Sequence, residues 1–111
     1  MADPRLRQLT IKTGVVKRLT KEKVVYEKEA VQQKDRIERL KAAGEDEHVL
    51  RKQEEVLQEA LMIIPDCQRR LAKAFEELSD FLKNEGELNE TKEYITASQI
   101  LEEAKLQLVK D

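Results

Sequence analysis

The chain has 111 residues, of which 40% are charged and only 4% are aromatic, and its net charge is −2. That length allows a single domain, residues 1–111, and a chain this short buries only about two-thirds of the surface that its unfolded form exposes. The high charge content, with three glycines, two prolines and no tryptophan, is typical of long, surface-rich helices and excludes a β-sheet protein. The near balance of charge gives no global reason to expect a nucleic acid or an anionic membrane as the partner.

Cysteine content and the first residues bear on the cellular compartment. Cys67 is the single cysteine, so the chain forms no internal disulfide and needs no oxidising compartment. The segment after Met1 carries charge where a signal peptide would need an apolar run, and no window approaches 18 uncharged apolar residues. We therefore expect a soluble protein of the cytoplasm.

The first predicted helix spans about residues 4–42. Asp3 is suited to cap its first turn, and Pro4 at the first helical position loses no hydrogen bond. Where a lysine interrupts the apolar seam, we expect either that its stem lies along the core while its ammonium group reaches water, or that this part of the seam is uncovered. The seam residues are Leu9, Val16, Leu19, Tyr26, Ala30, Ile37 and Leu40, and the interruptions are Lys12, Lys23 and Gln33.

A turn at residues 43–46 joins this helix to a second one over about residues 47–83. Gly44 suits a left-handed helix end and Asp46 suits the cap of the next helix, and so short a link makes the two helices antiparallel neighbours. Pro65 lies inside the second helix, at a cost of about 3 kcal/mol in a regular helix. We expect one long helix, kinked near Pro65 and held in line by its neighbours. Its apolar seam is Leu50, Leu57, Ile64, Leu71 and Leu78, with Ala60, Cys67, Ala74 and Phe81.

A third helix is predicted over about residues 87–108, after a turn at residues 84–86. At 1.5 Å per residue the three helices measure roughly 58, 55 and 33 Å, so the third covers only part of the other two. Pairing outward from the turn places Leu108 beside about Met62, where three helices become two. The predicted fold class is therefore all-α: an elongated, antiparallel three-helix bundle with two long helices and one shorter C-terminal helix. The expected core face of the third helix is Tyr94, Ala97, Leu101, Ala104 and Leu108, with Ile100 beside it.

Residues 28–42 and 47–61 would then form a bare two-helix hairpin. Its apolar residues have only one another to pack against, so either another chain completes this strip or it is simply a two-stranded coiled coil. These residues are Val31, Ile37, Leu40, Leu50, Val56 and Leu57.

The first helix is basic, with eight positive and two negative residues between Arg5 and Lys28. A nucleic-acid surface needs aromatic or groove-reading residues among the charges, and Tyr26 is the only aromatic there. The helix also lacks the Trp, Phe and Leu wedge of membrane-surface helices. The third helix carries five glutamates against two lysines, and we expect its negative charge to neutralise part of the positive charge of the first helix. We expect neither nucleic acid nor membrane as a partner.

Candidate catalytic and metal-ligating residues are few. Glu45 and His48 have the spacing of half a di-iron motif, but a full site needs two such pairs inside a four-helix bundle. Cys67 lies on the apolar seam and is interpreted as a small buried hydrophobe. Adjacent carboxylates such as Glu54 and Glu55 diverge by about 100° on a helix and cannot act as an acid/base pair. We expect no enzyme: no catalytic residue, no metal and no cofactor.

Three strings of the sequence are distinctive in their order and spacing: KTGVVKRL at residues 12–19 followed by KE at 21–22, YEKE at 26–29, and IPDCQRRL at 64–71. Together they resemble the tubulin-specific chaperone A family, also called tubulin-folding cofactor A. The resemblance implies a cytosolic, cytoskeleton-associated three-helix bundle. Such a protein binds β-tubulin released from the chaperonin, before other folding cofactors join it to α-tubulin, and uses no ATP, metal or catalysis.

The matched strings do not identify the residues that contact tubulin. As a hypothesis, we assign electrostatic steering of acidic β-tubulin to four basic residues and apolar contact to two valines. The alternative is a self-associating coiled-coil scaffold or adaptor, although we expect a monomer rather than a homodimer. The assigned residues are Lys17, Lys21, Arg69 and Arg70, with Val31 and Val56.

Overall fold

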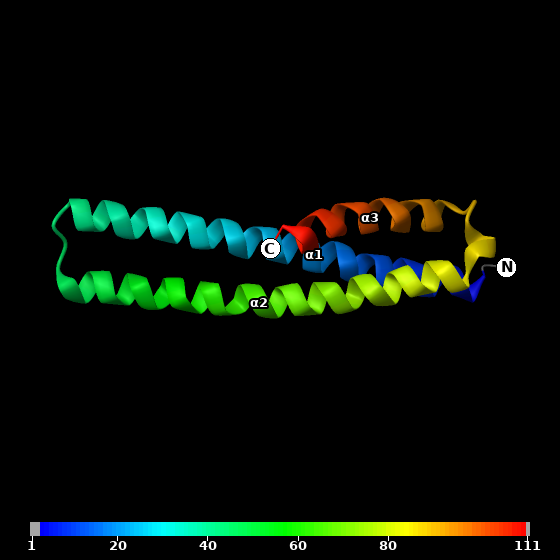
Figure 1. Ribbon diagram of the computed structural model, residues 1–111, viewed down its shortest axis with the longest axis horizontal. Helices are drawn as coiled ribbons and strands as arrows, with labels where there is room; N and C mark the ends of the chain where they lie inside the picture. Colours follow the sequence, from blue (N-terminus) through cyan, green and yellow to red (C-terminus); the bar gives the residue numbers. More distant parts are fainter. Residues whose placement is uncertain (1–2, 111) are drawn as a thin grey trace.

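The computed structural model describes residues 3–110 as three α-helices in an antiparallel rod of 65 × 23 × 17 Å. The first two, α1 (Pro4–Ala42) and α2 (Glu47–Asn84), run the length of the rod, and α3 (Lys92–Val109) covers only the half nearest the start of α1 (Figure 1). A short 3-10 helix, η1 (Gly86–Leu88), lies between α2 and α3. This architecture confirms the predicted fold class.

Aspartate side chains cap the N-termini of the two long helices, as the sequence suggests. Asp3 Oδ1 accepts a hydrogen bond from the Arg5 backbone N–H at 2.9 Å, and Asp46 Oδ1 accepts one from the His48 N–H, also at 2.9 Å. Each bond satisfies a backbone donor that lacks a partner within the helix. Between the helices, Gly44 has φ 75°, a left-handed conformation that glycine adopts without steric cost.

The start of α3 differs from the prediction. Expected at Glu87, the helix begins at Lys92, because η1 and a turn take up the intervening residues. Leu88, in η1, is buried. Thr91 Oγ1 donates to the Leu88 carbonyl at 2.7 Å and accepts from the Tyr94 N–H at 3.2 Å, so it both closes the turn and caps α3.

This longer connection also moves the end of α3 relative to α2. The Tyr94 hydroxyl donates to the Leu82 carbonyl, and Gln68 Nε2 donates to the Leu108 carbonyl. Both pairs are symmetric about Leu88, whereas a turn centred three residues earlier was expected. Leu108 therefore lies beside Gln68, and the predicted pairing with Met62 is wrong.

Pro65 does not interrupt α2, which is helical from Glu47 to Asn84. The seam continues through the proline, as predicted: Ile64 is half-buried, and Cys67 and Leu71 are buried. The proline lies three residues before Gln68, hence just beyond the end of α3. The bend expected at Pro65 stays a prediction.

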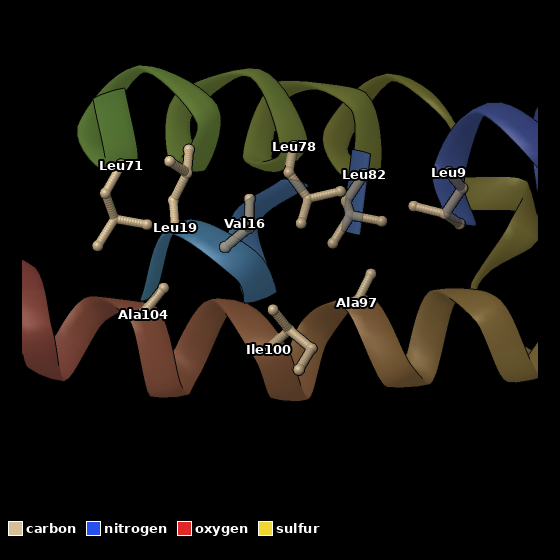
Figure 2. Packing of buried hydrophobic residues seen from close by; sticks show 9 residues of the cluster. All are labelled: Leu9, Val16, Leu19, Leu71, Leu78, Leu82, Ala97, Ile100 and Ala104. Atoms are coloured by element: carbon tan, nitrogen blue, oxygen red, sulfur yellow. The ribbon is translucent and has the colours of Figure 1, made fainter. Parts of the chain in front are cut away.

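The main hydrophobic core lies entirely in the three-helix half of the rod. Figure 2 shows the α2 leucines directed toward α1 and α3, where small and branched side chains fill the space between the helices. Alternating large and small residues let three helices pack closely. The cluster consists of Leu9, Val16, Leu19, Leu71, Leu78, Leu82, Ala97, Ile100 and Ala104.

Candidate functional site

The two lysines on the α1 seam are accommodated in different ways. Lys12 is half-buried, and its ammonium nitrogen lies 6.0 Å from the centre of the Phe81 ring, within reach of a cation–π interaction. Lys23 is 0% exposed, and its Nζ donates to the backbone carbonyl of Gln107 in the last turn of α3. Both expected alternatives are wrong for Lys23: this part of the seam is covered, and a helix carbonyl takes the place of water at the ammonium group.

The end of α3 forms a polar junction with the two long helices. Lys23 and Gln68 each donate to a carbonyl in its last turn, where a helix has no internal donors and carries partial negative charge. Lys110 Nζ lies 3.9 Å from Glu27 Oε1. That oxygen and Gln68 Oε1 are buried without a hydrogen bond from the described residues. The third helix is thus fastened at its end by polar groups and along its length by the core.

Beyond this junction, the two-helix half is held by a buried amide. Gln33 is 8% exposed, and its Nε2 donates to both the backbone carbonyl and the side-chain Oε1 of Gln53, each at 2.8 Å. Ala30 and Ile37 are the buried apolar residues on either side of it. A directional bond of this kind favours one alignment of two helices over a slipped one.

The two valines assigned to apolar contact are exposed, at 59% for Val31 and 50% for Val56, but they lie on opposite sides of the hairpin. Val31 is three heptads after Thr10, which lines the groove between α1 and α3. Val56 is two heptads before Arg70, which lines a groove on the other side of the α1–α2 pair. Residues a whole number of heptads apart share one side of a coiled-coil helix, so the structure does not bring the valines together.

Two of the assigned basic residues share one depression on the surface of α1. Lys17 and Lys21 line it together with Gly14, Arg18 and Val25. Glu22, Tyr26 and Glu29 complete the lining, so three basic and two acidic side chains border this depression.

Arg70 belongs to the same region through Arg18, which also lines the neighbouring groove between α1 and α2 together with Arg70 and Lys73. Arg69 lines neither hollow, although both arginines contact Asp66, at 3.5 Å for Arg69 and 3.0 Å for Arg70. Sequence reasoning missed Arg18 and Lys73 as members. The spacing of Arg18, one helical turn before Lys21, was the available signal for it. We define the basic surface as Lys17, Arg18, Lys21, Arg70 and Lys73.

Some of the acidic residues that neutralise the charge of α1 lie at the end of the rod where η1 connects α2 to α3. Arg5 binds Glu85 at 2.8 Å and also contacts Glu87, both in the connection between α2 and α3. Its guanidinium also bonds to the carboxylate of Asp3 and thereby lowers the pKa of that carboxyl. Arg18, in the basic surface, lies 3.7 Å from Glu22 of its own helix. Such partly exposed pairs leave much of the basic field directed outward.

The groups weighed for chemistry occupy unremarkable positions. His48 is exposed at the start of α2, and Cys67 is 3% exposed in the seam, where burial raises the pKa of its thiol. Within residues 3–110, no group of three or more His, Cys, Asp or Glu side chains could hold a metal ion. None of the helices in this range is long and apolar enough to cross a membrane.

A family model described as tubulin binding cofactor A matches residues 4–101, which span α1, α2 and the first part of α3. The chain belongs to the tubulin binding cofactor A family. The resemblance seen in the three sequence strings is thereby confirmed.

Cofactor A proteins from distant organisms match nearly the whole chain. The tubulin-specific chaperone A of Gallus gallus is 60% identical over 107 residues, covering 96% of this chain and 99% of the relative. A structure of human tubulin chaperone cofactor A has a TM-score of 0.81 at 51% identity, covering 93% of this chain and 100% of that one. For the structure of tubulin folding cofactor A from Arabidopsis thaliana the TM-score is 0.84 at 35% identity, covering 92% and 96%. The cofactor A fold therefore extends over this chain.

Proposed function

We propose that this cofactor A protein is a tubulin-folding chaperone. It binds and stabilises β-tubulin before other folding cofactors join that subunit to α-tubulin in the cytoplasm. It works by surface contact alone, as a monomer, with no catalytic step, no nucleotide and no metal. Family membership supports the class of client.

The single observation that carries the binding mode is the basic surface. Five basic side chains from two helices meet around one depression and its neighbouring groove. Like charges gathered on one side of a rod create a field that attracts an acidic protein and raises its association rate. Four acidic residues reduce this field: Glu22 and Glu29 line the depression, Glu77 lines the groove, and Asp66 contacts Arg70. The five basic residues outnumber them by one.

Association kinetics with purified β-tubulin test this proposal. The double variant Lys17→Glu/Lys21→Glu should associate about tenfold more slowly at low salt and show a flatter salt dependence. A matched control, Lys52→Glu/Lys105→Glu, makes the same change of net charge at exposed positions of α2 and α3, and should associate nearly as wild type does.

The outcomes separate the surface from the function. Unchanged association of the Lys17/Lys21 variant would refute the basic surface as the steering site while leaving the function in place. A wild-type protein that captures no β-tubulin would refute the function itself.

A second candidate function, a self-associating scaffold, is favoured by one feature of α2. Val49, Val56 and Ile63 recur at steps of seven and are 38%, 50% and 40% exposed, so they form an apolar line on one side of the helix. Sedimentation at micromolar concentration tests this alternative: we expect a monomer, and a tight dimer abolished by Val56→Glu would bring the scaffold forward.

A further inference from the structure

Gly14 occupies a position in α1 that the fold does not require to be glycine. It lies well inside a 39-residue helix, and within the described chain a positive φ occurs at Gly44 and not at Gly14. A Cβ built on Gly14 would meet no atom within 4 Å. Glycine in a helix interior costs about 1 kcal/mol relative to alanine. The intramolecular contacts therefore offer no compensation for this loss of stability.

The residues around Gly14 form a continuous stripe on the outer face of α1. Ile11 is 57% exposed and Val25 is 49% exposed, and Gly14 lies between them at helical spacing. Alternating steps of four and three residues keep one face of a helix, and these positions face away from the core residues Leu9 and Val16. We define the outer α1 stripe as Arg7, Ile11, Gly14, Arg18, Lys21, Val25 and Lys28.

Charge in the outer α1 stripe has one sign. Four of its seven residues are basic and none is acidic, although Glu22 and Glu29, outside the stripe, also line the depression around Gly14. Two exposed aliphatic side chains, a gap without a side chain and a row of cations make a surface complementary to a helix with apolar and acidic residues on one face.

We propose that the outer α1 stripe docks an acidic amphipathic helix of the client, with Gly14 at the point of closest approach. This inference rests on the proposed function and adds the docking face and the kind of element that it receives. Packed helices approach to 8–10 Å, depending on the side chains at the crossing, and Gly14 permits an approach at the short end of that range. Carboxylates of the client helix then pair with Arg18 and Lys21, while its apolar residues cover Ile11 and Val25.

Other occupants fit this face less well. A second copy docked through the same stripe, as in a twofold dimer, would bring the same row of cations against itself, and like charges facing one another oppose association. A membrane would receive only two aliphatic side chains and no aromatic anchor, too little apolar surface for stable insertion. The acidic helix alone matches both the charge and the gap.

Substituting Gly14 separates docking from folding. Gly14→Gln places a long side chain in the gap and also improves helix propensity, so Tm should stay the same or rise while affinity for purified β-tubulin falls at least tenfold. Gly14→Ala should weaken binding less. Ala72→Gln makes the same kind of enlargement at an exposed α2 position and should leave affinity unchanged.

Two adjacent valines give a second, independent comparison. Val25 belongs to the outer α1 stripe, whereas Val24, 42% exposed, points about 100° away around the helix. Val25→Glu should therefore weaken β-tubulin binding about tenfold, and Val24→Glu should leave it close to wild type. The pair matches residue type, exposure and added charge.

Each result decides the inference. Wild-type affinity in both Gly14→Gln and Val25→Glu would overturn the docking face while the chaperone function stands. Gly14→Gln that loses binding to phosphatidylserine vesicles but keeps β-tubulin binding would overturn it in favour of a membrane. A wild-type protein that captures no β-tubulin would overturn both the function and the inference.

Discussion

The three-helix and two-helix halves of the rod use the same pair of helices but differ in what stabilises them. In the first, nine buried apolar residues from three helices form one cluster. In the second, the buried residues are Ala30, Gln33 and Ile37 of α1, and the first buried residue of α2 is Cys67. A third helix therefore changes not only the amount of core but also the side chains that can be buried.

A buried amide suits the thinner half. Two helices alone cannot exclude water from a wide apolar seam, so apolar packing contributes little free energy to this half. A shift of α1 along α2 by one heptad would then cost little. The bonds from Gln33 to Gln53 supply direction where apolar packing supplies little. At the junction, Lys23 does the same for the end of α3. Stability is thus concentrated in one half, and alignment depends on polar groups in the other.

The largest expected effect separates the two halves directly. Leu78→Ala, at a fully buried position of the core, should lower the free energy of unfolding by about 2–5 kcal/mol, because it leaves a cavity among three helices. Leu57→Ala, at a half-buried position of the hairpin, should cost only about 1 kcal/mol. Urea denaturation of both variants measures the difference, and equal costs would show that the hairpin is as well packed as the core.

A change at the boundary between the halves comes next. Pro65→Ala restores an N–H donor for the Leu61 carbonyl and removes the ring that crowds that turn, so the free energy of unfolding should rise by up to about 3 kcal/mol. It should also straighten α2. Denaturation and β-tubulin binding should be measured together. Binding equal to wild type would mean that the fold merely tolerates the proline.

The polar end of α3 gives a smaller effect. Lys23→Met keeps an apolar stem but removes the donor to the Gln107 carbonyl, which should cost about 1–2 kcal/mol. Amide exchange in the last turn of α3 should become faster. Lys12→Met is the control, because that ammonium group lies over the Phe81 ring and bears on no carbonyl of α3. Exchange unchanged by Lys23→Met would contradict the role of the lysine as a clamp.

The smallest effect concerns the ion pairs at the start of α1. Because Arg5 holds the pKa of Asp3 below its ordinary value of 3.8, the pair stabilises the fold above that pH, and the contribution is lost as pH falls through the lowered pKa. Arg5→Gln should therefore lower Tm slightly at pH 7 and less at pH 3. Thermal melts at the two pH values test this, and a Tm difference that grows at low pH would contradict it.

Those parts of the fold that depend on local chemistry could be predicted from sequence. The two long helices follow from apolar spacing, and the conformations of Gly44 and Asp46 follow from their turn and cap preferences. The start of α3 did not follow, because a lone apolar residue such as Leu88 in a polar connection gives no sign of burial. The resulting error in the position of the turn also gave the end of α3 the wrong neighbour on α2, Met62 in place of Gln68.

The candidate site was predictable only in part, for a different reason. Spacing along α1 places Lys17 and Lys21 near each other, and the structure joins them to Arg70 through Arg18. Val31 directly follows the seam residue Ala30, whereas Val56 directly precedes the seam residue Leu57, and in an antiparallel pair these positions flank opposite edges of the seam. The assignment rested on exposure and apolar character and did not compare these positions, so it grouped two valines that face different ways.

The position of the core has a consequence for chain entropy. It joins the ends of α1 and α2 that lie farthest from the Gly44 turn. The two-helix half is therefore a segment of chain whose two ends the core holds together. The entropy of closing a loop changes by only about 0.6 kcal/mol for each doubling of length. Removing or adding a heptad in both arms would alter the rod by about 10 Å and leave the core intact. The length of the rod can therefore change without altering the packing of the core.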